Sequence, residues 1–107
     1  MSLFFAALLF ISLVQPATAA QGTLSLDGAG RRQQTIGSVV AVLRCWSEGN
    51  TKICEVNVTN TDDRSVYTET SFEGSTYPLT IQPSDYKVYR RESSTRWPIQ
   101  SVTISAN

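Results

Sequence analysis

The segment VVAVLRCWSEGNTKICEVNVT, residues 39–59, predicts a β-hairpin. Two runs rich in apolar and β-branched residues lie on either side of Gly49-Asn50, which is typical of two antiparallel strands joined by a two-residue loop. With Gly49-Asn50 as the loop, residues that face each other across the hairpin have numbers that sum to 99.

This register places Cys45 opposite Cys54 and Arg44 opposite Glu55. In a two-residue hairpin the pair that flanks the loop is hydrogen-bonded and the pair types alternate outward, so Cys45–Cys54 is a non-hydrogen-bonded pair. Because the strands approach most closely at such pairs, a disulfide is sterically reasonable there. We therefore expect a disulfide between Cys45 and Cys54, and a cross-strand ion pair between Arg44 and Glu55.

Side chains alternate between the two faces of a strand, so the faces of the hairpin can be separated by parity. One face is entirely apolar and is predicted to pack on the core: Val39, Ala41, Leu43, Cys45, Cys54, Val56 and Val58. The other face mixes apolar, polar and charged side chains and is predicted to face water or a partner: Val40, Val42, Arg44, Trp46, Ile53, Glu55, Asn57 and Thr59.

Short runs of strand-forming residues recur along the chain, separated by turns rich in Gly, Pro, Ser and Asp. About seven strands are expected, at 23–26, 36–46, 51–59, 65–72, 76–81, 86–91 and 97–105. No segment has a clear 3.6-residue apolar period. The pattern predicts an all-β fold, a small antiparallel β-sandwich forming a single domain at 21–107, with a small β-barrel as the alternative.

Three segments carry more specific expectations. The polar run 65–72 is predicted to be an edge-like strand, and Pro78 places the strand 76–81 at an edge or at a strand start, since proline cannot donate to a ladder. Arg31–Gln34 is polar throughout, so it is predicted to be a solvated connection or the start of the next strand. A phosphate or glycan contact by Arg31 and Arg32 is the alternative.

The run LTIQPSDY at 79–86 resembles the corner before the penultimate strand of immunoglobulin-like and fibronectin-like domains. In those domains a tyrosine at the strand start hydrogen-bonds back to the turn. The resemblance implies an immunoglobulin-like sandwich with Tyr86 in that role. The Cys45–Cys54 bridge departs from the immunoglobulin pattern, because it joins two strands of one hairpin instead of two sheets, and this leaves the topology open.

Residues 1–20 have the composition of a signal peptide. An apolar run at 3–14 is interrupted by Gln15-Pro16, and small residues follow, for cleavage after Ala19 or Ala20. One departure is that no Lys or Arg precedes the apolar run. An uncleaved membrane anchor is the alternative, and no later stretch is suited to cross a bilayer. We expect a secreted or periplasmic protein with oxidised cysteines and no membrane span after cleavage.

Composition excludes several classes of function. Nine Lys and Arg balance nine Asp and Glu, which argues against nucleic-acid binding. The chain has no histidine, so Ser-His and Cys-His dyads and histidine-ligated metals are excluded. A disulfide would also remove both cysteines from thiolate chemistry and zinc binding. We expect no enzymatic activity, no metal and no cofactor.

Two groups of residues are candidate binding sites, since Arg, Trp and Tyr are enriched at binding hot spots. Segments 86–91 and 97–105 are predicted to form a second hairpin. Its tip, at 92–95, would gather the first candidate group: Tyr89, Arg90, Arg91, Arg96 and Trp97. The alternative is that Trp97 and one tyrosine pack into the core, with the arginines lying over them.

The second candidate is Trp46 with Ile53, beside Val42, on the outer face of the first hairpin. An exposed Trp–Ile pair marks a partner surface; the alternative is that a loop covers the pair. Asn57-Val58-Thr59 also matches an N-glycosylation sequon, with Asn57 pointing outward. The polar run 60–63 shows too few oxygen ligands for calcium and is predicted to be a turn.

Three functions remain. The leading expectation is a secreted or periplasmic non-catalytic interaction domain, such as an adaptor, an inhibitor or an accessory subunit, whose partner is another protein. A carbohydrate-binding or adhesive domain is the first alternative, because both Trp–Arg groups suit a glycan. An immunoglobulin-like export or fibre-assembly chaperone that donates or covers strand edges is the second.

Overall fold

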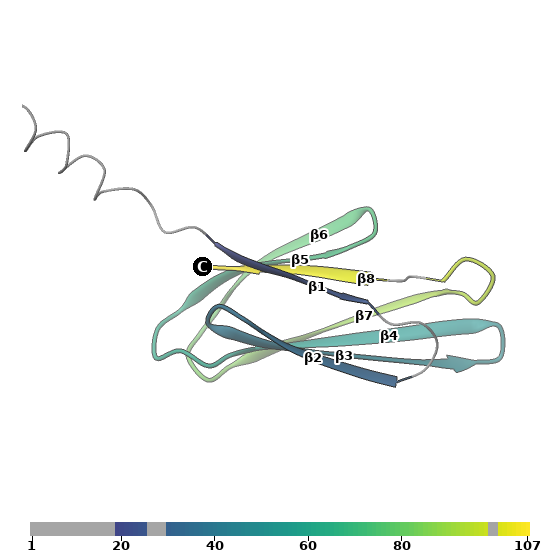
Figure 1. The fold of residues 1–107 in the computed structure, drawn as a ribbon, viewed down its shortest axis with the longest axis horizontal. Coiled ribbons are helices and arrows are strands. Elements are labelled where there is room, and N and C mark those ends of the chain that lie inside the picture. The colour runs from purple at the N-terminus through teal and green to yellow at the C-terminus, as the bar shows by residue number, and fades with distance from the viewer. Residues whose placement is uncertain (1–18, 26–29, 99–100) are drawn as a thin grey trace, which may run out of the picture.

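The computed structural model describes residues 19–25, 30–98 and 101–107. Two antiparallel sheets of four strands pack face to face (Figure 1). The strands are β1 (Ala20–Ser25), β2 (Gly30–Ile36), β3 (Val39–Glu48), β4 (Thr51–Asn60), β5 (Val66–Phe72), β6 (Ser75–Ile81), β7 (Tyr86–Ser94) and β8 (Ser101–Ala106). The first sheet has the order β1-β8-β5-β6 and the second β2-β3-β4-β7. The predicted all-β sandwich is confirmed, and the barrel alternative is wrong.

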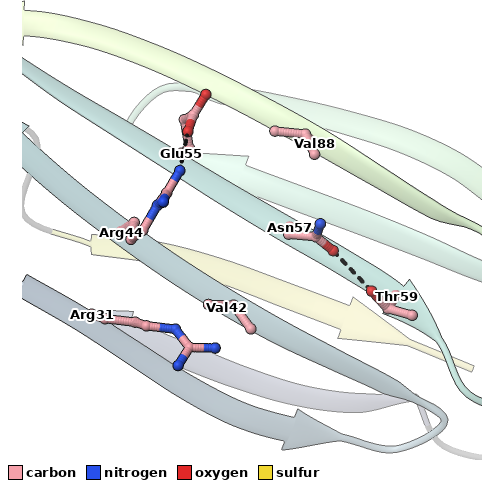
Figure 2. A pocket seen from close by; sticks show the side chains of 7 residues that line it. All are labelled: Arg31, Val42, Arg44, Glu55, Asn57, Thr59 and Val88. Carbon is pink, nitrogen blue, oxygen red and sulfur yellow. Dashed lines mark hydrogen bonds and ion pairs between the residues drawn. The ribbon is translucent and has the colours of Figure 1, made fainter.

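The hairpin β3–β4 pairs in the predicted register, with Cys45 opposite Cys54 and Arg44 opposite Glu55. Gly49 has a φ of 60°, which suits the first position of a two-residue hairpin loop. Arg44 Nη2 donates to Glu55 Oε1 at 2.9 Å (Figure 2). The predicted hairpin and its ion pair are both confirmed.

The core lies between the sheets and includes every residue of the predicted inward face of the hairpin. Apolar side chains from other strands complete it: Leu24, Ile36, Val66, Phe72, Ile81, Val102, Ile104 and Ala106. Two buried threonines of β5 also point inward, and Thr68 Oγ1 donates to the Leu79 carbonyl at 2.8 Å. The hairpin thus supplies one half of the core.

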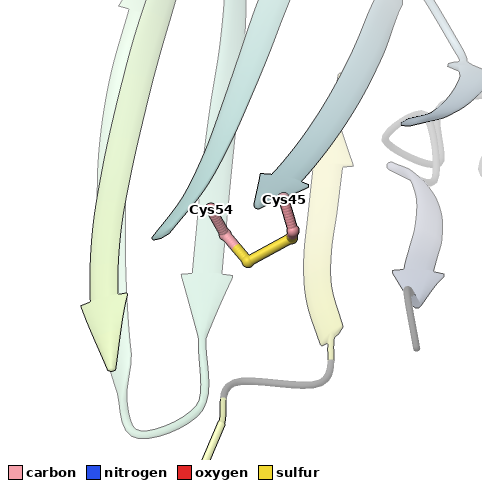
Figure 3. The surroundings of a disulfide bond; sticks show 2 residues. All are labelled: Cys45 and Cys54. Carbon is pink, nitrogen blue, oxygen red and sulfur yellow. A yellow bond between two sulfur atoms is a disulfide. The ribbon is translucent and has the colours of Figure 1, made fainter. Parts of the chain in front are cut away.

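The predicted disulfide is present between Cys45 and Cys54, on the buried side of the hairpin (Figure 3). The bridged residues are nine apart in sequence, so the bridge closes a short loop around the turn. A buried disulfide indicates an oxidising environment.

Replacing both cysteines, Cys45→Ala with Cys54→Ala, should lower the free energy of unfolding by about 2–3 kcal/mol, because the unfolded chain regains the entropy of the closed loop. Urea unfolding followed by tryptophan fluorescence measures the change. An unchanged midpoint and slope would show that the bridge does not stabilise the hairpin.

Two strand predictions need correction. The run Arg31–Gln34 belongs to a separate strand, β2, that forms a hairpin with β3, so the described residues form eight strands. The two-residue loop contains Gly37 at a φ of 57°. Every residue of β2 except Ile36 is exposed, so this edge strand shows no apolar alternation. The run 65–72 is not an edge either: β5 lies between β8 and β6.

The predicted second hairpin is wrong. β7 pairs with β4 in the second sheet, whereas β8 pairs with β1 and β5 in the first, so the chain crosses between sheets after Ser94. Residues 99–100 of the expected last strand lie outside the described residues. The edge placement of Pro78 is confirmed, because within the described part of the chain β6 pairs only with β5.

The strand order also differs from the immunoglobulin order. There the first strand pairs with the second, whereas here β1 pairs with β8. Tyr86 does begin β7, but its side chain is 58% exposed. The expected tyrosine bond to the turn does not appear among the hydrogen bonds of the described residues. The sandwich is shared with immunoglobulin-like domains; the connectivity is not.

Of the expected signal peptide, residues 1–18 lie outside the described part of the chain. Ala20 is the first residue of β1 and lies opposite Ala106. Within the described residues, no helix has the length and apolar character needed to cross a membrane.

Asn60 joins four strand ends. Its side chain is 1% exposed, and its Nδ2 donates to the carbonyls of Arg64 at 2.8 Å and Ile81 at 2.9 Å. Its backbone N–H donates to the Asp85 carbonyl at 2.9 Å. The end of β4 is therefore bonded to the start of β5, the end of β6 and the start of β7. The segment 60–63 forms this turn, as predicted.

Asn60→Ala should lower the free energy of unfolding by about 2–3 kcal/mol, since the buried Ile81 carbonyl and the part-buried Arg64 carbonyl lose their donor. Asn57→Ala, a half-buried asparagine on the same strand, is the matched control and should cost less than about 1 kcal/mol. Thermal and urea unfolding compare the two. Equal losses would rule out a special role for Asn60.

Candidate functional site

The outer face of the second sheet is the candidate site. We define it by the residues that point away from the first sheet: Arg31, Gln33 and Thr35 of β2; Val40, Val42, Arg44 and Trp46 of β3; Ile53, Glu55, Asn57 and Thr59 of β4; and Tyr86, Val88, Arg90 and Glu92 of β7. The opposite faces of β3 and β4 line the core, so these positions follow from strand alternation.

Three arginines and one glutamate form a row across this face. The register places Arg31 opposite Arg44, Arg44 opposite Glu55, and Glu55 opposite Arg90. Of the three arginines, Arg44 is the one that forms an ion pair within the row, with Glu55 at 2.9 Å. Arg90 lies 3.5 Å from Glu92, at the next outward position of β7.

Arg31 has no carboxylate partner among the described residues. Its Nη2 donates to Gln33 Oε1 at a long 3.4 Å. Gly37-Ser38 is the two-residue loop between β2 and β3, so the flanking pair Ile36–Val39 is hydrogen-bonded. Pair types alternate outward from the loop, which makes Arg31–Arg44 a non-hydrogen-bonded pair, in which side chains lie closest. Like charges directly opposite each other destabilise a sheet, so this pair needs an explanation other than stability.

A groove of about 510 Å³ lies over these strands (Figure 2). Its lining combines arginine, glutamate, amide, hydroxyl and apolar groups: Arg31, Val42, Arg44, Glu55, Asn57, Thr59 and Val88. Arg31 and Arg44 also line an adjoining hollow of about 450 Å³ that reaches Trp46. The two arginines therefore stand where the two depressions meet.

Trp46 is half-buried beneath two guanidinium groups. The Cζ atoms of Arg44 and Arg90 lie 5.6 and 5.9 Å from its ring centroid, and its Nε1 donates to Glu48 Oε1 at 3.2 Å. Ile53, on the same face, is 1% exposed and lies outside the core cluster between the sheets. The prediction of an exposed Trp–Ile pair is therefore wrong for Ile53, whose neighbours across the strands are Trp46 and Glu92.

The predicted tip cluster is divided among three places. Arg90 points to the outer face beside Trp46. Tyr89 and Arg91 point to the inner side of β7, opposite the buried Val56 and Cys54. Arg96 and Trp97 lie in the turn that follows β7, and Trp97 is 78% exposed. The alternative in which Trp97 packs into the core is thus wrong as well.

Asn57 lies on the outer face, as predicted, and lines the groove. Its Oδ1 accepts a hydrogen bond from Thr59 Oγ1 at 2.8 Å, and its side chain is half-buried in the middle of β4. Glycosylation at Asn57 stays a prediction, and a glycan there would occupy the groove.

Titratable groups with shifted pKa values lie away from the groove. The backbone N–H of Asp63 holds the pKa of Asp62 below its usual value, and a hydrogen bond to Glu69 raises the pKa of Tyr67. Burial raises the pKa of Tyr89, an effect that Thr70 partly offsets. Across the described ranges, no group of three or more His, Cys, Asp or Glu side chains could hold a metal ion.

Comparison with known proteins found no matching family model, no matching curated protein and no matching solved structure. The description of the site therefore depends on its geometry alone. Sequence reasoning missed the role of Arg31 in it, because Arg31 faces Arg44 only once β2 is known to be a strand.

Arg31→Gln should raise the free energy of unfolding by about 0.2–1 kcal/mol at low salt, because it removes a like-charge pair. The gain should shrink at 0.5 M salt, where exposed charges are screened. Chemical unfolding at the two salt concentrations measures both effects. A loss of stability would show that Arg31 stabilises the sheet.

Proposed function

We propose that this protein is an exported, non-catalytic interaction domain that binds an acidic segment of a partner protein on the outer face of its second sheet. The observation that carries the proposal is the Arg31–Arg44 pair. Two like charges are placed directly opposite each other, in a groove, and only one of them has a carboxylate partner among the described residues.

A carboxylate from a partner would relieve this repulsion. Arginine presents a planar fork of donors that matches a carboxylate, and charge-assisted hydrogen bonds are stronger than neutral ones. Arg44 is already oriented by Glu55, so Arg31 is the arginine with donors to offer. Val42 and Val88 supply apolar contact on the groove lining.

A partner protein is favoured over a glycan by the aromatic side chains. Sugar rings stack on an exposed aromatic face, whereas two guanidinium groups already lie over Trp46. Trp97 is exposed but is not among the residues that line the groove. A carbohydrate-binding function is therefore retained only as an outcome of the test below.

Export is supported by the apolar leader at 1–20 and by the Cys45–Cys54 disulfide, which suits an oxidising compartment. Amino-terminal sequencing of the exported protein should find Ala20 or Gln21 first. A protein that retains Met1 would contradict signal cleavage.

Hexaglutamate is a suitable probe of the groove at low salt, with binding followed by NMR of the arginine side chains. We expect shifts at Arg31 and Arg44, and about tenfold weaker binding by Arg31→Gln, because a charge-assisted hydrogen bond is lost. Arg32→Gln is the matched control, since Arg32 is exposed on the opposite face of β2.

Equal weakening by Arg31→Gln and Arg32→Gln would show diffuse attraction and would contradict a specific site. Binding of oligogalacturonate at the same arginines, without binding of hexaglutamate, would replace the protein partner with an acidic glycan. Absence of both would overturn the proposal.

A further inference from the structure

One side of the sandwich is open, between the edge strands β6 and β7. Tyr77 and Leu79 of β6 point between the sheets, because they lie opposite the buried Thr70 and Thr68 of β5. They are nevertheless 39% and 36% exposed. These two side chains therefore form a partly exposed apolar margin beside the buried core.

The inner face of β7 carries two cations around an aromatic ring. Lys87, Tyr89 and Arg91 alternate along the strand and share this face, opposite buried residues of β4. Lys87 Nζ lies 6.0 Å from the Tyr89 ring centroid. Arg91 Nη1 donates to the Tyr77 hydroxyl at 3.3 Å, and the rings of Tyr77 and Tyr89 are 5.7 Å apart.

Neither cation has a carboxylate partner among the described residues, where the ion pairs involve other side chains. Inward-pointing charges on an edge strand discourage pairing with another strand. Both charges are positive, however, so they discourage only some strands. Lys87 and Arg91 repel a basic strand and attract an acidic one.

Among the described residues, β7 pairs only with β4, so one side of its backbone is free. Val56 forms a non-hydrogen-bonded pair with Leu43 of β3, so its backbone N–H and C=O point toward β7. Val56 and Tyr89 are therefore a hydrogen-bonded pair between β4 and β7. The backbone groups of the intervening residues, including Val88 and Arg90, then point toward the free edge.

We propose that the free edge of β7 accepts an extended acidic segment of a partner protein as an added antiparallel strand. The segment would hydrogen-bond to Val88 and Arg90. Residues opposite Lys87 and Arg91 would form non-hydrogen-bonded pairs, in which side chains lie closest, and would point inward. Acidic residues fit these two positions, with an apolar residue between them beside Tyr89. Its two cations lie on the face of β7 opposite the groove; the two sites share Val88, whose side chain lines the groove and whose backbone lies at the free edge.

Charge also disfavours a second copy of this chain as the occupant in the register centred on Tyr89. Antiparallel pairing of β7 with β7 about Tyr89 would place Lys87 opposite Arg91 twice, and like charges directly opposite each other are destabilising. The neighbouring edge, β6, contains Pro78, which cannot donate to a ladder. An acidic strand on β7 is thus the pairing that this side of the sandwich favours.

The test uses two synthetic peptides, Ser-Glu-Thr-Val-Thr-Glu-Ser and the same peptide with Lys in place of both Glu. Amide hydrogen exchange, followed by NMR, reports directly on the edge. The acidic peptide should slow exchange at Val88 and Arg90, whereas the basic peptide should leave both amides unchanged. Binding without protection of these amides would overturn the proposal, as would equal protection by both peptides.

Charge reversal gives a positive control. Lys87→Glu with Arg91→Glu should reverse the protection at the edge: the basic peptide should slow exchange at Val88 and Arg90, and the acidic peptide should not. Arg32→Gln, on β2, should leave the protection by the acidic peptide unchanged. Lys87→Glu alone, which leaves the Arg91–Tyr77 contact in place, should weaken acidic-peptide binding on the order of tenfold. If charge reversal does not change which peptide is preferred, Lys87 and Arg91 serve only to discourage strand pairing at this edge, and the proposal fails. Failure of this test leaves the groove proposal standing, because that proposal depends on Arg31.

Discussion

The register of β3 against β4 is the constraint on which the rest of the structure depends. Side chains alternate with a period of two, so a slip of β3 by one residue would turn Val39 and Leu43 to solvent and Arg44 inward. The Cys45–Cys54 disulfide fixes this register covalently. Because β2 and β7 pair with the two outer sides of this hairpin, the same register decides which of their residues reach the outer face.

Local sequence patterns were sufficient where a strand has one buried face. The alternation and the Gly49-Asn50 loop predicted the hairpin, its register, its core face and its disulfide before the structure was known. They failed for β2, because an edge strand with both faces exposed carries no apolar alternation. They also failed for β7 and β8, since the sheet that a strand joins is determined by packing between distant segments.

The candidate site shows the same division. Arg44, Trp46 and Asn57 could be placed on the outer face by parity, whereas the position of Arg31 depends on a strand that the pattern concealed. Parity also predicted that Ile53 faces outward but not that it would be buried, because its burial depends on side chains from neighbouring strands. Arg90 was assigned to a hairpin tip and instead lies beside Trp46.

The arrangement of charge suggests why the outer face and the open side differ. On the outer face, Glu55 and Glu92 partner two of the three arginines, so one arginine is left to engage a ligand. On the inner side of β7, Lys87 and Arg91 contact tyrosines and have no carboxylate partner among the described residues. Both cations are therefore free to pair with acidic side chains of an added strand. Both proposals name acidic partners, although the chain as a whole has no net charge.

The most direct measurement is the NMR contact between the Hα atoms of Arg31 and Arg44 in the oxidised protein. A non-hydrogen-bonded antiparallel pair brings the two Cα atoms to about 4.5 Å, so a strong Hα–Hα cross-peak is predicted. A cross-peak from Arg44 to Gly30 or Arg32 instead would shift β2 by one residue and turn Arg31 away from the groove. That result would contradict the account of the outer face.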